Sequence, residues 1–141
     1  MNVNSSISLL SNIHTITADF LTARLKQNGF PDFASSHGNI LFQLSVNDRQ
    51  PMGDLAEKIN RDKSTTTVLV RKLEREGYVK GEADPTDRRS RIIYLTEKGK
   101  QFNSLAQELS RDLLSTFFNG FSEDEKNNFY QMLLRIKKNF N

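Results

Sequence analysis

The sequence predicts a mainly α-helical fold in which one β-hairpin follows four helices and precedes two more. Apolar residues recur at helical spacing in six segments, whereas the stretch 78–95 changes to the pattern of paired strands. Two short helices joined by a tight turn come directly before that stretch. This order is typical of a winged helix-turn-helix with a two-stranded β-hairpin wing. The N- and C-terminal helices lie outside this motif, and we expect them to be dimerisation helices.

Three helices are expected in the first part of the chain. The first covers about 8–26 on a wide apolar stripe and stops near Gly29, which tolerates a left-handed backbone. The second is short and is capped by Ser35 or Ser36. The third covers 53–59, after a polar break. The stripe of the first helix carries Leu9, Ile13, Ile16 and Phe20, and the expected inward residues of the second and third are Ile40, Leu41, Leu44, Leu55, Ala56 and Ile59.

The fourth helix and the hairpin form the central motif. Asp62 is a natural cap for a helix over about 63–76, because its carboxylate can accept free backbone N–H groups. Residues 78–83 and 90–95 predict two strands, and the polar residues 84–87 predict the turn between them. A short helix, a turn, a second helix and a hairpin therefore follow one another.

Two helices are expected after the hairpin. Thr96 caps a long one that ends at Asn119 and Gly120, and Ser122 with Glu125 forms a capping box that opens the last. The C-terminal end is crowded with aromatic residues, and the first helix is apolar over much of its circumference. One small domain would struggle to bury both surfaces, so we expect a homodimer; the alternative is that these helices pack on their own domain. The crowded aromatic residues are Phe117, Phe118, Phe121, Phe129 and Phe140.

Composition excludes several classes of protein. The chain has 141 residues, the usual size of one domain, and no apolar run approaches the length needed to cross a membrane. It starts without a secretory signal pattern, so we expect a cytoplasmic protein. With no cysteine and only two histidines, no disulfide, metal site or cofactor is expected. No motif places a base beside a nucleophile, so we do not expect an enzyme.

The positive charge of the chain is concentrated in one window. Residues 61–98 hold 10 Lys/Arg and 7 Asp/Glu, which leaves ten of each sign elsewhere and accounts for the whole net charge of +3. A local basic excess suits a polyanionic partner such as DNA. On charge alone, an ordinary solvated face explains the window equally well.

One face of the helix that starts at Lys63 is the first candidate DNA contact. Its exposed stripe follows helical spacing opposite the apolar face. Hydroxyls and free N–H groups at its start suit phosphates or base edges. Val68 matches a thymine methyl group or is simply an exposed valine, and Arg71 fits either guanine or phosphate. The predicted contacts are Lys63, Ser64, Thr65, Thr67, Val68, Arg71 and Arg75.

The hairpin loop is the second candidate contact. Arg88, Arg89 and Arg91 lie within four residues and repel one another unless a polyanion neutralises them. A narrow minor groove attracts inserted arginine side chains. Asp87 is expected to orient an arginine through a bidentate pair. The alternative is an ordinary solvated hairpin.

Two stretches resemble the multiple-antibiotic-resistance regulator (MarR) family. The first is 55–79, and the more specific second one reads D-P-x-D-R-R followed by L-T-x-x-G at 84–99. Helix number, order and length also agree, so the resemblance covers nearly the whole chain. It implies a homodimer on a palindromic duplex operator, with Arg89 in the minor groove, Asp87 steadying the arginines, and a repressor relieved by an effector. Asn60, where the family often has glycine, and Val68, where it often has a basic residue, depart from the pattern.

The resemblance also sets the expected organisation. We expect a single domain over 1–141, with a winged-helix DNA-binding lobe at 34–98 and dimerisation helices at 1–28 and 99–141. A small aromatic or anionic effector would lie between the lobe and the dimer base. The residues predicted to line its cleft are His14, Phe20, Arg24, Phe33 and His37.

An alternative function is a winged-helix module that binds another protein and not DNA. The wing arginines argue against it, since a wing that binds protein has no need for them.

Overall fold

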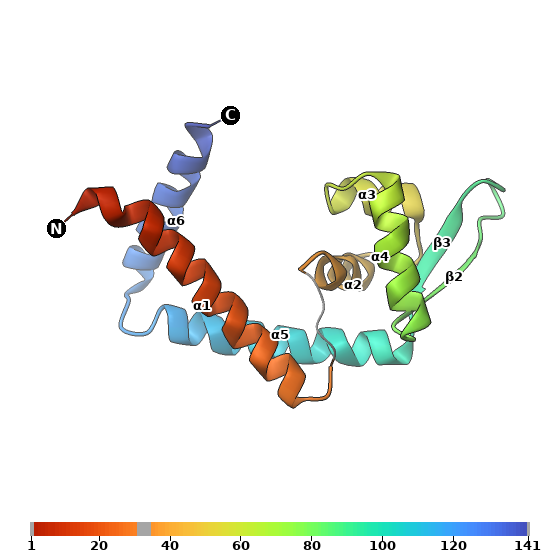
Figure 1. The fold of residues 1–141 in the computed structure, drawn as a ribbon, viewed down its shortest axis with the longest axis horizontal. Helices are drawn as coiled ribbons and strands as arrows, with labels where there is room; N and C mark the ends of the chain where they lie inside the picture. Colours follow the sequence, from red (N-terminus) through yellow and green to blue (C-terminus); the bar gives the residue numbers. More distant parts are fainter. Residues whose placement is uncertain (1, 31–34, 141) are drawn as a thin grey trace.

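The computed structural model describes residues 2–30 and 35–140. In this part of the chain, six α-helices and the β-hairpin follow one another in the predicted order, so the mainly helical winged-helix fold is confirmed (Figure 1). A 3₁₀ turn and one further short strand, neither of them predicted, are also present. The elements are η1 (Val3–Ser5), α1 (Ser6–Gln27), α2 (Ser35–Val46), β1 (Gln50–Pro51), α3 (Met52–Lys58), α4 (Lys63–Arg75), β2 (Val79–Ala83), β3 (Arg91–Leu95), α5 (Glu97–Phe117) and α6 (Glu123–Lys138).

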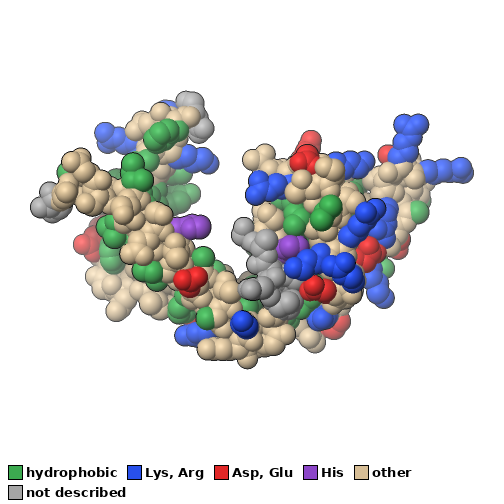
Figure 2. Space-filling view, in the orientation of Figure 1, with side chains coloured by type: hydrophobic (Ala, Val, Ile, Leu, Met, Phe, Trp, Pro, Cys, Tyr) green, Lys and Arg blue, Asp and Glu red, His purple; other side chains and the backbone are tan. Residues whose placement is uncertain are grey.

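Helix α5 connects two parts of the molecule that otherwise lie apart. Figure 1 shows α2, α3, α4 and the hairpin at one end of α5, and α1 and α6 crossing near the other. Both chain ends lie on the side away from the wing. The space-filling view shows a hollow between the two parts (Figure 2). No helix in residues 2–30 and 35–140 is long and apolar enough to cross a membrane.

The hydrophobic core lies in the part that carries the wing. Its fully buried side chains come from α2, α3, α4, the strands and the start of α5, and they include Ile40, Leu41, Leu55, Val70, Leu73, Tyr78 and Ile93. The Phe102 ring meets the Tyr78 ring edge-on at 5.9 Å and the Phe30 ring at 5.2 Å. By contrast, α1 and α6 contain no buried residue. The core therefore supports α4 and the hairpin as one unit.

The sheet has three strands where the sequence predicted two. Strand order is β1-β3-β2, all antiparallel, and β2 pairs with β3 from Val79↔Leu95 at the base to Ala83↔Arg91 at the distal end. The unpredicted β1 has two residues, one of them Pro51. Buried Gln50 holds it in place, since its side-chain amide donates to the Gln43 carbonyl at 2.7 Å and accepts from Lys58 at 2.6 Å.

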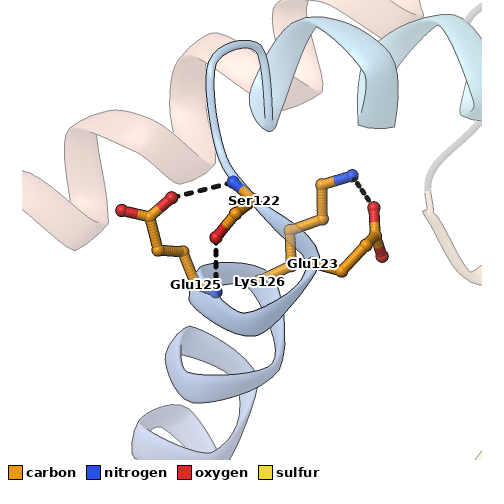
Figure 3. Close-up of polar contacts among 4 residues, drawn as sticks. All are labelled: Ser122, Glu123, Glu125 and Lys126. Carbon is orange, nitrogen blue, oxygen red and sulfur yellow. Dashed lines mark hydrogen bonds and ion pairs between the residues drawn. The ribbon is translucent and has the colours of Figure 1, made fainter.

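Local hydrogen bonds account for the predicted helix boundaries. At the start of α6, the Ser122 hydroxyl accepts from the Glu125 N–H at 3.3 Å, and the Glu125 carboxylate accepts from the Ser122 N–H at 2.8 Å (Figure 3). These hydrogen bonds lower the pKa of Glu125. After α4, Gly77 has a φ of 84°, the left-handed conformation that glycine adopts without strain. Asn60 takes φ 54° in the turn before α4, in the place where the family pattern favours glycine.

Candidate nucleic-acid interface

Helix α4 exposes the face that the sequence predicted. Thr66, Val70 and Leu73 are buried against the core, and the opposite side of the helix faces solvent. Val68 retains 66% of its side-chain exposure although it is apolar. Six of the seven predicted contacts are exposed, namely Lys63, Ser64, Thr65, Val68, Arg71 and Arg75, and Thr67 is half-buried.

The hydroxyl groups at the start of α4 donate within the chain. Ser64 and Thr65 donate to the Asp62 carboxylate at 2.6 and 2.9 Å, and the Thr65 N–H donates to it at 2.7 Å. Thr67 donates to the Lys63 carbonyl at 2.8 Å. These bonds, that from Ser64 first, lower the pKa of Asp62 to about 2. The cap is therefore complete above the ordinary Asp pKa and is lost only as pH falls toward 2.

The wing loop has a framework of its own. Buried Asp84 accepts from the Thr86 hydroxyl at 2.7 Å and from the Thr86 N–H at 2.9 Å, which lowers the pKa of Asp84. Asp87 accepts from the Arg89 N–H at 2.9 Å. Asp87 thus orders the loop backbone, and among the described residues no ion pair joins its carboxylate to an arginine side chain, so the predicted bidentate pair is not formed. The loop is held in shape before any DNA binds.

The arginines at the tip of the wing project into solvent. Arg88 and Arg89 are exposed, and within residues 2–30 and 35–140 no ion pair or hydrogen bond engages either guanidinium group. Figure 2 shows Lys and Arg side chains gathered over the part of the molecule that carries the wing. Two neighbouring cations at a pre-ordered tip suit a polyanion.

Arg91, in contrast, is paired with another residue of the chain, although its side chain is exposed. Its guanidinium donates to both carboxylate oxygens of Glu74 on α4, at 2.8 and 3.2 Å. The hydrogen bonds to Arg91 lower the pKa of Glu74, and the same contact raises the pKa of Arg91. Arg91 shares a sheet face with Ile93 and Leu95, so strand alternation was the signal in the sequence that it points toward α4. The partner on α4 was not predicted.

A second ion pair at the wing was missed by the sequence reasoning. Arg49, in the turn before β1, pairs with Glu82 on β2, and its guanidinium lies 4.9 Å from the centre of the Tyr94 ring on β3. Arg49 has φ 59°, a conformation unusual for a residue with a side chain. No pattern in the sequence indicated this contact, because it joins segments more than 30 residues apart.

A groove between α1, α2 and α5 is the candidate effector site. Its volume is about 810 Å³, and α2, which belongs to the winged part of the chain, forms one of its walls. Most of its wall is apolar, with polar groups at Thr22, Asn39, Gln107 and Arg111. Its lining residues are Ala18, Leu21, Thr22, Leu25, Gly38, Asn39, Phe42, Phe102, Asn103, Ala106, Gln107, Leu109, Ser110 and Arg111.

The residues predicted for the effector are dispersed. Phe20 lines a separate apolar pocket with the C-terminal aromatics, and Arg24 lies 4.8 Å from the Phe20 ring centre and 3.9 Å from Asp112. His37 is buried in α2 and His14 is exposed on α1. Phe33 lies outside the described residues. None of the four that are described is among the lining residues of the groove.

No metal centre accompanies these sites in the described part of the chain. Residues 2–30 and 35–140 contain no cluster of three His, Asp or Glu side chains able to hold a metal ion.

Comparison with known proteins points in the same direction as the geometry. The model of the MarR family matches residues 34–90. The HTH-type transcriptional regulator SarZ of Staphylococcus aureus (strain USA300) is 30% identical over 102 residues, which are 72% of this chain and 68% of SarZ.

Solved structures share the fold. A MarR-like transcription regulator from Bacillus cereus ATCC 10987 superposes with a TM-score of 0.77 at 22% identity, covering 98% of this chain and 97% of that one. The PcaV transcriptional regulator from Streptomyces coelicolor, in complex with its natural ligand, has a TM-score of 0.74 at 18% identity, with 98% and 93% covered.

Proposed function

This chain belongs to the MarR family of helix-turn-helix transcriptional regulators, and from that premise we propose that it is a dimeric, sequence-specific repressor. Membership implies DNA binding and a regulatory role, not an enzymatic one. The observation that carries the proposal further is the wing tip, where Arg88 and Arg89 extend unpaired from a loop ordered by Asp84 and Asp87. This tip enters a minor groove while the exposed face of α4 lies in the adjacent major groove.

A homodimer explains the apolar surface at the other end of the molecule. Ile7 on α1 is 81% exposed and Ile16 59%, and Phe140, which follows the end of α6, is 86% exposed; α1 and α6 contain no buried residue. Exposed apolar surface of this extent is typical of a protein interface. We assign 1–28 and 99–141 to the dimer base and 34–98 to the DNA-binding lobe of one domain. A two-fold axis then presents two α4 helices to a palindromic operator.

The groove between α1, α2 and α5 supports the proposal that a small effector binds to this protein. It has the volume and the largely apolar wall of small-molecule sites, and it is bounded by both α1 and the lobe helix α2. PcaV has been solved with its natural ligand, and its fold is shared here. A small aromatic or anionic molecule in the groove would change the angle between the lobe and the dimer base and so release DNA.

A protein-binding winged helix is the second candidate. The two exposed wing arginines favour DNA, because neighbouring cations gain more from a phosphate backbone than from a mixed protein surface.

Selection from random-sequence duplex DNA tests the proposed function. We expect enrichment of a two-fold symmetric site whose half-sites are about 10–10.5 base pairs apart, centre to centre, as two recognition helices of a dimer require. A mock selection without protein is the control. Recovery of no common sequence would contradict sequence-specific binding.

A further inference from the structure

The distal half of the wing is not held by the hydrophobic core. Buried apolar side chains in the two strands of the hairpin are confined to its base and middle, at Val79, Ile93 and Leu95. At the distal end, the paired residues Ala83 and Arg91 are both exposed. The loop with Arg88 and Arg89 continues from this end, so a small rotation of the hairpin displaces the tip. Something other than apolar packing has to fix its direction.

Ion pairs hold the distal half from both sides. On the face toward α4, the Arg91 guanidinium donates twice to Glu74. On the opposite face, Glu82 pairs with Arg49, which also stacks on Tyr94. Glu82 pairs with Ile92, the residue next to Arg91, so the two ion pairs lie one residue pair apart along the hairpin. The hairpin is thus restrained on both faces at the point where core contacts end.

Gly81 provides the space for the contact with α4. A Cβ atom at this position would lie 2.5 Å from Nη2 and 2.7 Å from Cζ of Arg91. Gly81 faces the same side of the sheet as Arg91 and Ile93, so the arginine crosses over it to reach Glu74. Any side chain at 81 would displace the guanidinium from Glu74. The glycine and the ion pair are therefore parts of one arrangement.

We infer that Glu74, Arg91 and Gly81 form a positioning device that sets the angle of the wing relative to α4 and so places Arg89 on DNA. Arg91 acts through the wing, and not as a direct DNA contact. This inference rests on the proposed function. It assigns to Glu74, an acidic residue on the DNA-binding helix, a favourable role in binding an anion.

The sign of the Glu74→Gln effect separates positioning from charge. Removing a carboxylate near DNA strengthens binding if only Coulomb repulsion changes. Positioning predicts the opposite, a weakening of about fivefold or more, on a duplex enriched from random DNA by the parent chain. Glu57→Gln is the matched control, because it removes the same charge from exposed Glu57 on α3 without touching the wing. Binding strengthened equally by both variants would overturn the inference.

Gly81→Ala tests the same device without any change of charge. The added methyl group displaces the Arg91 guanidinium, so we expect a weakening similar to that of Glu74→Gln. It also lies 3.0 Å from Cδ1 of buried Ile93, so the thermal midpoint of unfolding is measured beside the affinity. If Glu74→Gln folds poorly, the DNA affinity of Gly81→Ala tests the inference in its place. Full binding by a folded Gly81→Ala chain would contradict the inference.

A double-mutant cycle shows whether the device acts through the wing tip. In an Arg89→Ala background, Glu74→Gln should weaken binding less than about twofold, because the side chain that it positions is absent. Equal losses in both backgrounds would overturn the inference. If Arg91→Ala weakens binding while Glu74→Gln strengthens it, Arg91 contacts DNA directly. If the parent chain enriches no duplex, the proposed function itself fails.

Discussion

Arg88, Arg89 and Arg91 are neighbours in sequence but differ in their surroundings. Arg91 is held by Glu74, whereas the other two guanidinium groups extend into solvent from a loop whose backbone is fixed by Asp84 and Asp87. A cation that makes no ion pair before binding gives up no internal contact when it meets a phosphate or a minor groove. Arg89 is therefore expected to contribute more to DNA affinity than its charge alone would.

Arg89→Ala should weaken binding to the selected duplex by about tenfold or more, the effect of losing one specific arginine contact. The dimer should stay intact, because the wing is remote from α1 and α6 (Figure 1). Fluorescence anisotropy and sedimentation measure the two properties. Lys100→Ala, which removes one exposed positive charge from α5 outside the groove, is the charge-matched control. Parent-like affinity of Arg89→Ala would show that the wing assignment is wrong.

Val68 leads to a prediction about thymine. If its exposed side chain covers a thymine methyl group, replacing that thymidine by deoxyuridine should cost the parent about 0.8 kcal/mol, the transfer free energy of one such group. Val68→Ala should bind both duplexes equally. Competition binding with singly substituted duplexes makes the comparison. If no thymine-to-uracil change affects the parent, Val68 is simply an exposed valine.

Short-range side-chain contacts could be predicted from the sequence, and long-range ones could not. Asp62 and Ser122 cap helices as expected, because each bonds to a backbone group three residues away. The Glu74–Arg91 pair spans 17 residues, and its formation depends on how β3 packs against α4. None of the described residues predicted to line the effector cleft lines the groove, for the same reason. The angle between α1, α2 and α5 decides which side chains line the groove, and the sequence does not give that angle.

The junction between the hairpin and α5 links the wing to the rest of the molecule. Thr96 caps α5 through the Gly99 N–H at 3.2 Å, and its own N–H donates to the Tyr78 carbonyl at 3.1 Å. A Cβ atom on Gly99 would lie 2.2 Å from that same carbonyl oxygen. The close approach of helix and strand therefore requires glycine at 99.

Gly99→Ala should lower the free energy of unfolding by about 1–3 kcal/mol, the usual cost of overpacking, because the obstacle is backbone. Gly53→Ala is the control, since Gly53 lies exposed in α3 with nothing within 4 Å of an added Cβ. It should be neutral or stabilising through helix propensity. Urea denaturation followed by circular dichroism compares them. Equal stabilities of the two variants would contradict the described junction.

The helices could be predicted because each has an apolar stripe and a recognisable boundary, such as Asp62 or Gly77. β1 could not, because two residues that include a proline carry no strand pattern. The buried Gln50 also read as part of a polar break, since its partners Gln43 and Lys58 come from neighbouring helices. Elements with their own periodicity are visible in a sequence, while elements held by tertiary contacts are not.

At the scale of the whole molecule, the exposed apolar surface and the excess of positive charge lie at opposite ends. Figure 2 shows most of the visible Lys and Arg side chains over the winged part, a smaller group at the end of α6, and hydrophobic side chains along α1 and α6. The chain ends contribute little to the core that supports α4, and they present the surface that a second copy would bury. Dimerisation and DNA contact are therefore expected to depend on different segments.

A chain ending at Asn119 lacks α6 and should be monomeric. It should also bind the selected duplex much more weakly, because one lobe engages only one half-site. Sedimentation equilibrium measures the mass, and circular dichroism confirms that the remaining helices are folded. A truncated chain that is folded and still dimeric would show that the dimer base lies elsewhere.

The central claim is that α4 and the wing bind duplex DNA through its phosphates and grooves. Its most direct test is the affinity for the selected duplex over a series of salt concentrations. We expect the logarithm of the binding constant to fall linearly with the logarithm of salt concentration, with a slope of about −0.9 for each phosphate neutralised. A binding constant that does not change with salt would contradict the claim.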